Sequence, residues 1–484
     1  MIPNYVGIDI GTTATKAVVF SPEGQQLFQV SREYEMHHPH PNWSIQKPAE
    51  LLQAVLDCIH DVSQQFQPAF FSFSSAMHSL ILVDEAGQPL TDCILWADNR
   101  ANAQAECLRQ SPRGLAIYQK TGIPIHSFSP LTKLLWFKEK EQAIFKRTYK
   151  FISAKEYIWH HLTGRYQVDS SMASGTGLMN LSTLQWESEI LDYLGIRADQ
   201  LSEVVSPLYH TSGIEDQQNY VIGAGDGPLA SLGTGAMAAD KLALTIGTSG
   251  AVRLPVNHPT VDPLMRTQCY HLVEDQYLSL GAINNGAVVL QWLKESVLRT
   301  NASFEDLFVQ ASSIAAGSEG LLFVPYLLGE RAPIWDASAK GAILGITINH
   351  QQAHFVRATL EGIVLGLRHI AEVLLPSTAE RNNIEIRVSG GFAKSDLWLQ
   401  IVADVFQMPV ALSQTVEGSA WGAVLIGFKA LGIKHKEPDG EEQVFSPNRN
   451  NSQVYAEVFE KFKQVYPLLN ELGQKHIHTQ NTFI

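Results

Sequence analysis

The sequence predicts an α/β protein of two domains, each with a mixed sheet, and three observations support this. Strand-like runs are followed by helical runs in the first half, and the same order returns in the second half. The 484 residues exceed the size at which one hydrophobic core keeps growing. The phrase Ile-Gly-Thr is written once in each half. We therefore expect two domains, over 1–240 and 241–484, rather than a barrel.

The first half begins with strands and then alternates with helices. Pro48 is well placed to open a helix that runs to Phe66, because proline suits the first helical turn and Leu52, Val55 and Ile59 recur at helical spacing. Strands are expected at about 5–10, 14–20, 26–34, 69–75, 79–84 and 91–96, and further helices at about 98–109, 131–141, 153–163 and 228–239.

The second half opens on another hairpin and is richer in helices. The hairpin is expected at 242–254, and further strands near 268–281 and at 384–389. Helices are expected at 284–299, 303–315, 350–375, 394–407, 418–431 and 453–472.

The composition is that of an ordinary globular protein, with 45% hydrophobic and 17% charged residues. The net charge of −13 argues against non-specific binding to nucleic acid or to an anionic membrane, since both need a basic face. The four cysteines show no C-x-x-C spacing, which fits a reducing compartment. No run approaches the roughly 18 apolar residues of a membrane span. We expect a cytoplasmic protein with neither a nucleic-acid nor a membrane partner.

Both copies of the repeated phrase lie between two apolar runs, which is typical of a β-hairpin. Thr12 and Thr13 follow Gly11 in the first copy, and Thr248 follows Gly247 in the second. Glycine lets backbone N–H groups approach a ligand closely, and hydroxyl groups add donors, so such tips suit phosphate oxygens. Two copies predict a polyphosphate that is bound from both halves.

Asp9 stands directly before the first tip, at the end of an apolar strand where a carboxylate has no packing role. A carboxylate beside phosphate-binding amides would repel the phosphates unless a cation lies between them, so this pattern implies Mg²⁺. Lys16, just beyond the tip, is placed to offset phosphate charge. The alternative is an exposed turn aspartate and a solvated lysine.

Asp226 lies between two glycines, after an apolar run and before Pro228, which is well placed to open a helix. An aspartate at a strand-to-helix junction is often only a turn residue or an N-cap. An exposed carboxylate in such a turn also suits a general base that accepts the proton of a substrate hydroxyl. The spacing alone leaves both readings open.

A third glycine-rich turn, Gly390-Gly391, follows a strand and precedes a helix. Glycines in this position let a flat base or a ribose lie against the backbone, which indicates a nucleotide contact. Neither G-x-G-x-x-G nor the P-loop pattern is present. If phosphates are bound, the hairpins bind them.

A set of polar and aromatic residues in the first half is suited to a sugar or a sugar acid. Aromatic rings stack on a polyol face, and Arg and Asp side chains form bidentate contacts with it. The alternative for the Trp-Ala-Asp-Asn-Arg stretch is a core tryptophan, an N-cap aspartate and a surface arginine. The residues of this set are Met77, His78, Trp96, Asp98, Arg100 and Lys133.

The chain resembles the FGGY carbohydrate kinases. One family signature is matched by Gly341–Ile346 with His354–Glu361, and the other by Phe128–Trp136 with Lys133 as its central lysine, although Lys140 departs from the usual polar choice. The resemblance implies two actin-like, ribonuclease H-like domains, with mixed sheets flanked by helices and a cleft between them. ATP and Mg²⁺ are the implied cofactors.

The resemblance also implies roles for residues that match the family motifs. Asp226 matches the catalytic base of the family. Asp9 and Asp226 match the carboxylates that lie at Mg²⁺. The family usually has Asn in place of Ser395, and glycerol kinases carry Gly in place of Ala287. The expected phosphate contacts are Thr12, Thr13, Lys16, Gly247 and Thr248, and the expected adenosine contacts are Gln291, Gly390, Gly391 and Ser395.

The substrate is read from the loops around Met77 and Trp96. Glycerol kinases have an Arg-Glu pair where this chain has Met77-His78, and the loops look most like those of bacterial gluconate kinases. The implied reaction transfers phosphate from ATP to the 6-hydroxyl of gluconate, with Arg100, Lys133 or His78 facing the carboxylate. The alternatives are another sugar or polyol, such as xylulose or ribulose, and a non-catalytic sugar sensor. Homodimers are common in the family, so a homodimer is one expectation.

Overall fold

The computed structural model describes residues 3–375, 383–412, 417–435 and 443–480. The chain divides into two compact units. Unit 1 comprises Met1–Met237, Pro255–Ser279 and Glu417–Gly440, and unit 2 comprises Ala238–Leu254, Leu280–Val416 and Glu441–Ile484. Both units are therefore built from segments that are far apart in the sequence.

Unit 1 contains a mixed six-stranded sheet, as the sequence predicts. Its order is β13-β14-β5-β1-β2-β3. The three central strands are parallel to one another, whereas β2, β3 and β13 are antiparallel to their neighbours. The strands are β1 (Asn4–Ile10), β2 (Ala14–Phe20), β3 (Gln26–Glu33), β5 (Pro68–Ser75), β13 (His210–Ser212) and β14 (Asn219–Gly225).

Helices and short strand pairs surround this sheet. The helices are α1 (Pro48–Gln65), α2 (Asn102–Arg109), α3 (Pro112–Thr121), α4 (Pro130–Lys140), α5 (Gln142–Arg147), α6 (Ala154–Thr163), α7 (Ser170–Ser174), α8 (Ser188–Leu194), α9 (Asp226–Gly233) and α15 (Gly418–Leu431). The strands of these pairs are β4 (Ile45–Gln46), β6 (Ile81–Val83), β7 (Cys93–Ile94), β8 (Lys150–Ile152), β9 (Gln167–Asp169), β10 (Met179–Asn180), β11 (Gln185–Trp186) and β12 (Glu203–Val205). Strand β17 (Gln268–Val273) also belongs to unit 1 and is hydrogen-bonded to β18.

The two faces of the sheet in unit 1 are covered by different helices. Alternate residues of a strand point to opposite faces. Val6 and Ile8 of β1 belong to the apolar cluster that includes α1 and α6, whereas Tyr5 belongs to the cluster that includes α15. Asp9 has the parity of Tyr5, so its side chain projects toward the face that α15 covers.

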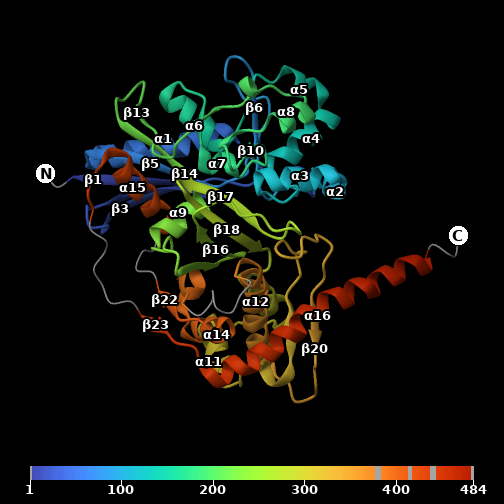
Figure 1. The fold of residues 1–484 in the computed structure, drawn as a ribbon. Helices are drawn as coiled ribbons and strands as arrows, with labels where there is room; N and C mark the ends of the chain where they lie inside the picture. Colours follow the sequence, from blue (N-terminus) through green and yellow to red (C-terminus); the bar gives the residue numbers. More distant parts are fainter. Residues whose placement is uncertain (1–2, 376–382, 413–416, 436–442, 481–484) are drawn as a thin grey trace. The chain divides into compact units, whose positions relative to one another are not determined.

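Helix α15 packs on this face at backbone distance. A Cβ added to Gly7 would lie 2.0 Å from the carbonyl oxygen of Ala420, and one added to Gly422 would lie 2.0 Å from that of Leu229 in α9. Only glycine allows this approach. Figure 1 shows α15, from the red end of the colour scale, beside the blue β1. A late segment of the chain therefore completes the first unit.

Unit 2 is built on a second mixed sheet, also as predicted. The strand order is β18-β16-β15-β21-β22-β23, with β15 antiparallel to β16 and parallel to β21. Of β16 and β18, only Gly250–Leu254 and Leu280–Ile283 belong to this unit. The strands are β15 (Lys241–Ile246), β16 (Gly250–Val256), β18 (Gln276–Ile283), β21 (Glu385–Ser389), β22 (Val410–Leu412) and β23 (Val444–Phe445), with a separate pair of β19 (Leu322–Val324) and β20 (Ala342–Leu344).

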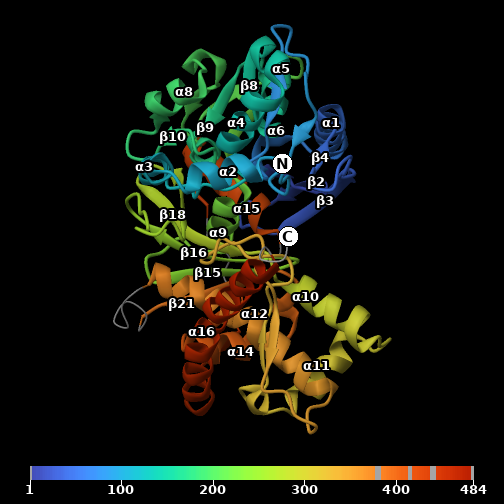
Figure 2. The same ribbon diagram turned by 90° about the vertical axis from the view of Figure 1, so that its right-hand side faces the viewer.

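The helices of unit 2 include α10 and α11, which Figure 2 shows as neighbours. The helix predicted at 284–299 is interrupted, because α10 continues as a π-helical turn over Leu293–Leu298. The predicted helix 228–239 of unit 1 is also corrected: α9 begins at Asp226 and ends at Gly233. The helices are α10 (Ala287–Trp292), α11 (Phe304–Ser312), α12 (Gln352–Leu374), α14 (Asp396–Phe406) and α16 (Arg449–Gln480).

Candidate active site

The carboxyl ends of the parallel strands bring Asp9 and Asp226 to one edge of the sheet in unit 1. Asp9 pairs in register with Ser74 of β5, and Ser74 pairs with Ala224 of β14. Asp226 follows two residues after Ala224. Neighbouring strands lie about 4.8 Å apart, so β1 and β14 are separated by about 10 Å. The two carboxylates therefore share an edge without direct contact between their strands.

Asp9 is half-buried and is held by its neighbour on β5. Ser74 Oγ donates a hydrogen bond of 2.7 Å to Asp9 Oδ1. Burial raises the pKa of Asp9, and Glu417 raises it further, whereas Ser74 and Lys16 lower it. Oxygen donors are the ligands that Mg²⁺ prefers, and it is often held by one or two carboxylates together with water and phosphate. No group of three or more His, Cys, Asp or Glu side chains that could hold a metal occurs among the described residues. Asp9 thus fits a carboxylate ligand of a phosphate-bound Mg²⁺, not an all-protein cage.

Lys16 lies opposite Asp9 in the β1–β2 hairpin and forms an ion pair with Glu417. Its Nζ lies 3.0 Å from Oε1 and 3.2 Å from Oε2 of Glu417, the residue before α15. Sequence reasoning missed Glu417. The only available signal was an acidic residue directly before the glycine that opens a predicted helix.

The first Gly-Thr tip is tied down through its carbonyl groups. Tyr34 Oη donates to the carbonyl of Gly11, and Gln46 Nε2 donates to that of Thr12, both at 2.6 Å. Trp96 Nε1 donates to Thr12 Oγ1 at 3.2 Å. Trp96, expected to stack on a sugar, is therefore joined to the tip that was expected to bind phosphate. Thr13 is exposed at the turn.

Asp226 is the first residue of α9, directly after β14, and is half-buried. Its Oδ1 accepts a hydrogen bond of 2.7 Å from the backbone N–H of Gly227. Ser419 Oγ lies 3.4 Å from its carbonyl oxygen, to which it donates. The start of α15 thus reaches both acidic positions, through Glu417 beside Asp9 and through Ser419 at Asp226.

The Met77–His78 turn follows the end of β5. His78 has a left-handed backbone (φ 68°), which is uncommon for a residue with a side chain. Its Nδ1 donates to the carbonyl of Gly175 at 2.7 Å, and its Nε2 lies 2.9 Å from Tyr270 Oη. Met77 is buried. The structure brings this turn and Asp226 together, because Met77 lies against Gly225.

Lys133 is fully buried, and its ammonium group donates hydrogen bonds to backbone carbonyls. Lys133 Nζ donates to the carbonyl of His78 at 2.6 Å and to that of Phe128 at 2.9 Å. Burial lowers the pKa of Lys133 to about 7. In this arrangement Lys133 stabilises the turn at His78 through its hydrogen bond to the His78 carbonyl.

Asp98 and Arg100 form a buried bidentate pair. Arg100 Nε donates to Asp98 Oδ1 and Nη2 to Oδ2, each at 2.8 Å, and the guanidinium lies 3.6 Å from the ring centroid of Trp43. Asp98 also accepts from the backbone N–H of Ser44 at 2.8 Å. The charges of Arg100 and Asp98 compensate each other. In this arrangement the Arg100 side chain stabilises the loop in which it lies.

A cavity of about 650 Å³ lies in unit 2 and collects most of the expected nucleotide contacts. Gly247 and Gly391 line it, and a Cβ added to either would meet no atom within 4 Å. Ser395 also lines it and caps α14 by accepting from Trp398 N–H at 3.3 Å. The expected residues in the lining are Gly247, Thr248, Gln291, Gly391 and Ser395, and the apolar wall includes Leu290, Phe304, Phe308, Val309 and Trp398.

This cavity fits an adenosine group. Apolar and aromatic side chains provide a surface for a flat base, whereas the open backbone at the two glycines leaves room for ribose and phosphate. Gly390 does not line the cavity but shapes it, because its φ of 103° turns the chain after β21 and brings it close to the carbonyl of Ile246. The side chain of Gln291 donates to Glu295 Oε1 at 3.1 Å.

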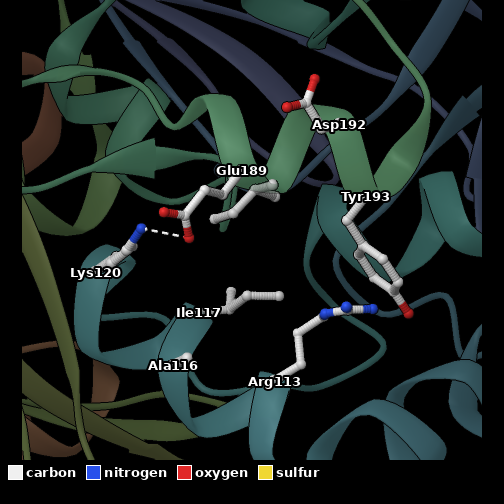
Figure 3. A pocket seen from close by; sticks show the side chains of 8 residues that line it. Arg113, Ala116, Ile117, Lys120, Glu189, Asp192 and Tyr193 are labelled. Carbon is white, nitrogen blue, oxygen red and sulfur yellow. Dashed lines mark ion pairs between the residues drawn. The ribbon is translucent and has the colours of Figure 1, made fainter.

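A second cavity, of about 470 Å³, lies between α3 and α8 of unit 1. Figure 3 shows Lys120 paired with Glu189 across it and Arg113 beside the ring of Tyr193, with Asp192 turned away. None of the residues expected at the site lines it, and its Lys120 and Glu189 are paired with each other. We therefore assign the chemistry to the strand ends and the larger cavity.

Among the described residues, no helix is long and apolar enough to cross a membrane.

Comparisons with known proteins cover nearly the whole chain. The N-terminal domain of the FGGY family of carbohydrate kinases matches residues 4–238, and its C-terminal domain matches residues 242–431. Gluconokinase of Bacillus licheniformis is 37% identical, over 98% of this chain and 96% of its own. Gluconokinase of Bacillus subtilis (strain 168) is 38% identical, over 89% and 88% of the two chains. Xylulose kinase of the same strain is 29% identical, over 97% of both.

Solved structures that resemble this chain are also described as gluconate and xylulose kinases. A structure described as gluconate kinase from Lactobacillus acidophilus superimposes with a TM-score of 0.93 at 34% identity, over 97% of this chain and 98% of its own. A structure described as ligand-bound xylulose kinase from Lactobacillus acidophilus gives the same values. The predicted actin-like fold with two mixed sheets is confirmed.

Proposed function

The chain belongs to the FGGY family of carbohydrate kinases, and we propose that within this family it transfers the γ-phosphoryl group of ATP to the 6-hydroxyl of D-gluconate. The observation that carries this proposal is its greater identity to gluconokinases, 37–38%, than to a xylulose kinase of similar coverage, 29%. The catalytic details below rest on the geometry of the two units.

Asp226 is proposed as the general base that accepts the proton of the 6-hydroxyl. Its half-buried carboxylate stands at a glycine-flanked strand end, where a hydroxyl can approach. The contribution of such a base is roughly 10²–10⁴-fold in rate. Met77 lies against Gly225, the residue before Asp226. Met77 and the adjacent His78 are proposed to contact the sugar chain.

Asp9 is proposed to hold Mg²⁺ of the nucleotide, with Asp226 as the second carboxylate at this edge. When bound, Mg²⁺ neutralises phosphate charge and helps to orient the transferred group in line. Ser74 keeps Asp9 oriented by its hydrogen bond. Lys16 is proposed to exchange its contact with Glu417 for a phosphate oxygen when the nucleotide binds, since both partners offer anionic oxygens.

The nucleotide is proposed to use the two hairpins and the cavity of unit 2. Thr12 and Thr13 of the first tip and Gly247 and Thr248 of the second are assigned to the phosphates. Gln291, Gly390, Gly391 and Ser395 are assigned to adenosine, of which all but Gly390 line the cavity. Trp96 and the Asp98–Arg100 pair are assigned to the wall of the sugar site, with Lys133 supporting His78.

A xylulose kinase is the second candidate, favoured by the structural similarity to a xylulose kinase at a TM-score of 0.93. An equimolar mixture of gluconate, xylulose, ribulose and glycerol, incubated with limiting ATP, separates the candidates. We expect 6-phosphogluconate as the main product by phosphorus NMR. A predominance of xylulose phosphate would reverse the assignment.

The role of Asp226 is tested by Asp226→Asn, with the exposed Asp192→Asn as a matched control. We expect Asp226→Asn to lose at least about 100-fold in kcat while it binds metal-free ADP with unchanged affinity, because the base acts in the chemical step. Asp192→Asn should retain kcat. A near wild-type kcat for Asp226→Asn would remove Asp226 from this role.

A further inference from the structure

A buried ion pair lies behind the strand end that carries Asp226. Lys155 Nζ is 2.7 Å from Asp169 Oδ2, and the two side chains are 3% and 0% exposed. Lys155 lies at the start of α6, and Asp169 ends β9 and caps α7. A buried ion pair can often be replaced by apolar residues of similar volume without loss of stability, so stability alone does not account for it.

The ion pair holds the backbone directly before Asp226. Lys155 Nζ donates a second hydrogen bond, of 3.2 Å, to the carbonyl of Ala224. The N–H of Gly225 donates to Ser171 Oγ at 3.3 Å, and Ser171 lies in the short helix that Asp169 caps by accepting from Met172 N–H at 2.9 Å. The last two residues of β14 are therefore fixed by the pair and by the helix that it anchors.

The other end of α7 holds the turn assigned to the sugar. The carbonyl of Gly175, the residue after α7, accepts from His78 Nδ1 at 2.7 Å. A Cβ added to Gly175 would lie 2.7 Å from Met77 Cε, and one added to Gly225 would lie 2.7 Å from Met77 Sδ. Met77 is therefore packed between the end of α7 and the residue before Asp226.

We propose that Lys155 and Asp169 are positioning residues that, through α7, set Asp226 relative to the Met77–His78 turn. The inference rests on the proposed roles of Asp226 and of this turn. Lys155 and Asp169 contact neither the sugar nor the nucleotide in this scheme. They act by fixing Ala224 and Gly225 at one end of α7 and His78 at the other. A displacement of about 1 Å at a reacting group is enough to cost a large factor in rate.

The test compares Lys155→Met and the double variant Lys155→Met/Asp169→Asn with wild type in steady-state kinetics. Asparagine keeps the oxygen that caps α7, and the double variant leaves neither member of the pair as an unpaired buried charge, so we expect it to fold even where the single variant does not. We expect kcat to fall at least about tenfold and KM for gluconate to rise, with KM for ATP unchanged. Loss of folded protein alone would lower kcat without moving either KM.

The matched control is Arg357→Met, which breaks a buried ion pair in unit 2. Arg357 Nε lies 2.7 Å from Glu361 Oε1, with exposures of 7% and 3%, so the pair resembles Lys155–Asp169 in distance and burial. We expect this variant to lose stability but to keep kcat per folded molecule and KM for gluconate. Amide hydrogen exchange of wild type and variants gives a second readout: exchange over 222–228 and at 77–79 should accelerate in the Lys155 variants and not in the control.

The outcomes separate the inference from the proposed function. Folded Lys155 variants with wild-type kcat, KM for gluconate and exchange would overturn the inference while leaving the proposed function intact. Failure of wild type to phosphorylate gluconate would overturn the proposed substrate; the same variants, assayed with the sugar that wild type does accept and by hydrogen exchange, would still decide the inference.

Discussion

At the residue scale, the hydrogen bond from Ser74 to Asp9 gives a testable pH dependence. Burial raises the pKa of Asp9, and Ser74 lowers it because its hydroxyl stabilises the carboxylate form. Ser74→Ala removes the lowering contribution, so the pKa of Asp9 rises and the carboxylate is lost at a higher pH. We expect the acid limb of kcat/KM for ATP to move to a higher pH, because a hydrogen bond to a charged group favours its ionised form. Measured pH profiles that coincide for the variant and wild type would contradict this role.

Residues at strand ends could be predicted from the sequence, whereas their partners could not. Asp9 and the two Gly-Thr tips stand out because a polar group directly after an apolar strand has no packing function. Glu417 and Ser74 reach the same place through the fold, from the residue before α15 and from a position within β5, and neither sequence pattern indicates this. Lys133 shows the converse: the sequence signals an important cation, but only the structure shows that it donates to two backbone carbonyls.

At the element scale, alanine substitutions at the glycines that line the cavity of unit 2 should weaken nucleotide binding without changing stability. Gly247→Ala and Gly391→Ala each add a methyl group that meets no protein atom within 4 Å, at positions without a positive φ. We expect little change in the free energy of unfolding, within about 0.5 kcal/mol, but an increase in KM for ATP of at least about tenfold, because the methyl group occupies space left for the nucleotide.

Gly366→Ala is the control for these variants. Gly366 lies in α12, away from the cavity lining, and its added methyl group also meets no atom within 4 Å. KM for ATP should therefore stay at its wild-type value. An unchanged KM in Gly247→Ala and Gly391→Ala would place the nucleotide outside this cavity.

Long elements could be predicted because their apolar periodicity is extended. Helix α15 was predicted at 418–431 and is found there. Helix α7 was not predicted, since five residues are too few to show a helical period. It follows a three-residue strand, β9, that carries equally little pattern. The proposed positioning role falls on this short element, which only the structure reveals.

At the scale of the whole molecule, buried Glu330 makes stability depend on pH. Burial raises its pKa to about 7, against hydrogen bonds from Asn284, Asn285 and Arg331 that lower it. An acid whose pKa is higher in the folded state binds protons more strongly there, so its stabilising contribution is lost as the pH rises from about 4.5 to 7. Glu330→Gln carries no charge at any pH in this window.

The free energy of unfolding should therefore fall between pH 4.5 and pH 7 by about 3 kcal/mol more in wild type than in Glu330→Gln. Urea unfolding at both pH values measures this difference. Equal pH dependence of the two proteins would show that Glu330 does not titrate in this range.

The division of the chain into two units could be predicted from the sequence only in part. Two α/β domains with mixed sheets could be predicted from the repeated order of strands and helices. That residues 417–435 pack in unit 1 could not, because this packing depends on contacts between residues some 400 positions apart. Gly7 and Gly422, which allow α15 to approach β1 and α9, acquire their meaning only in the folded chain.

The most direct test of the central claim is the ratio of kcat/KM for gluconate to that for xylulose, from ATP-dependent ADP release by the wild-type protein. We expect gluconate to be preferred by at least about 100-fold, which corresponds to about 2.7 kcal/mol of differential transition-state binding. A ratio below one would contradict the proposed substrate and would assign the chain to the xylulose kinases of its family.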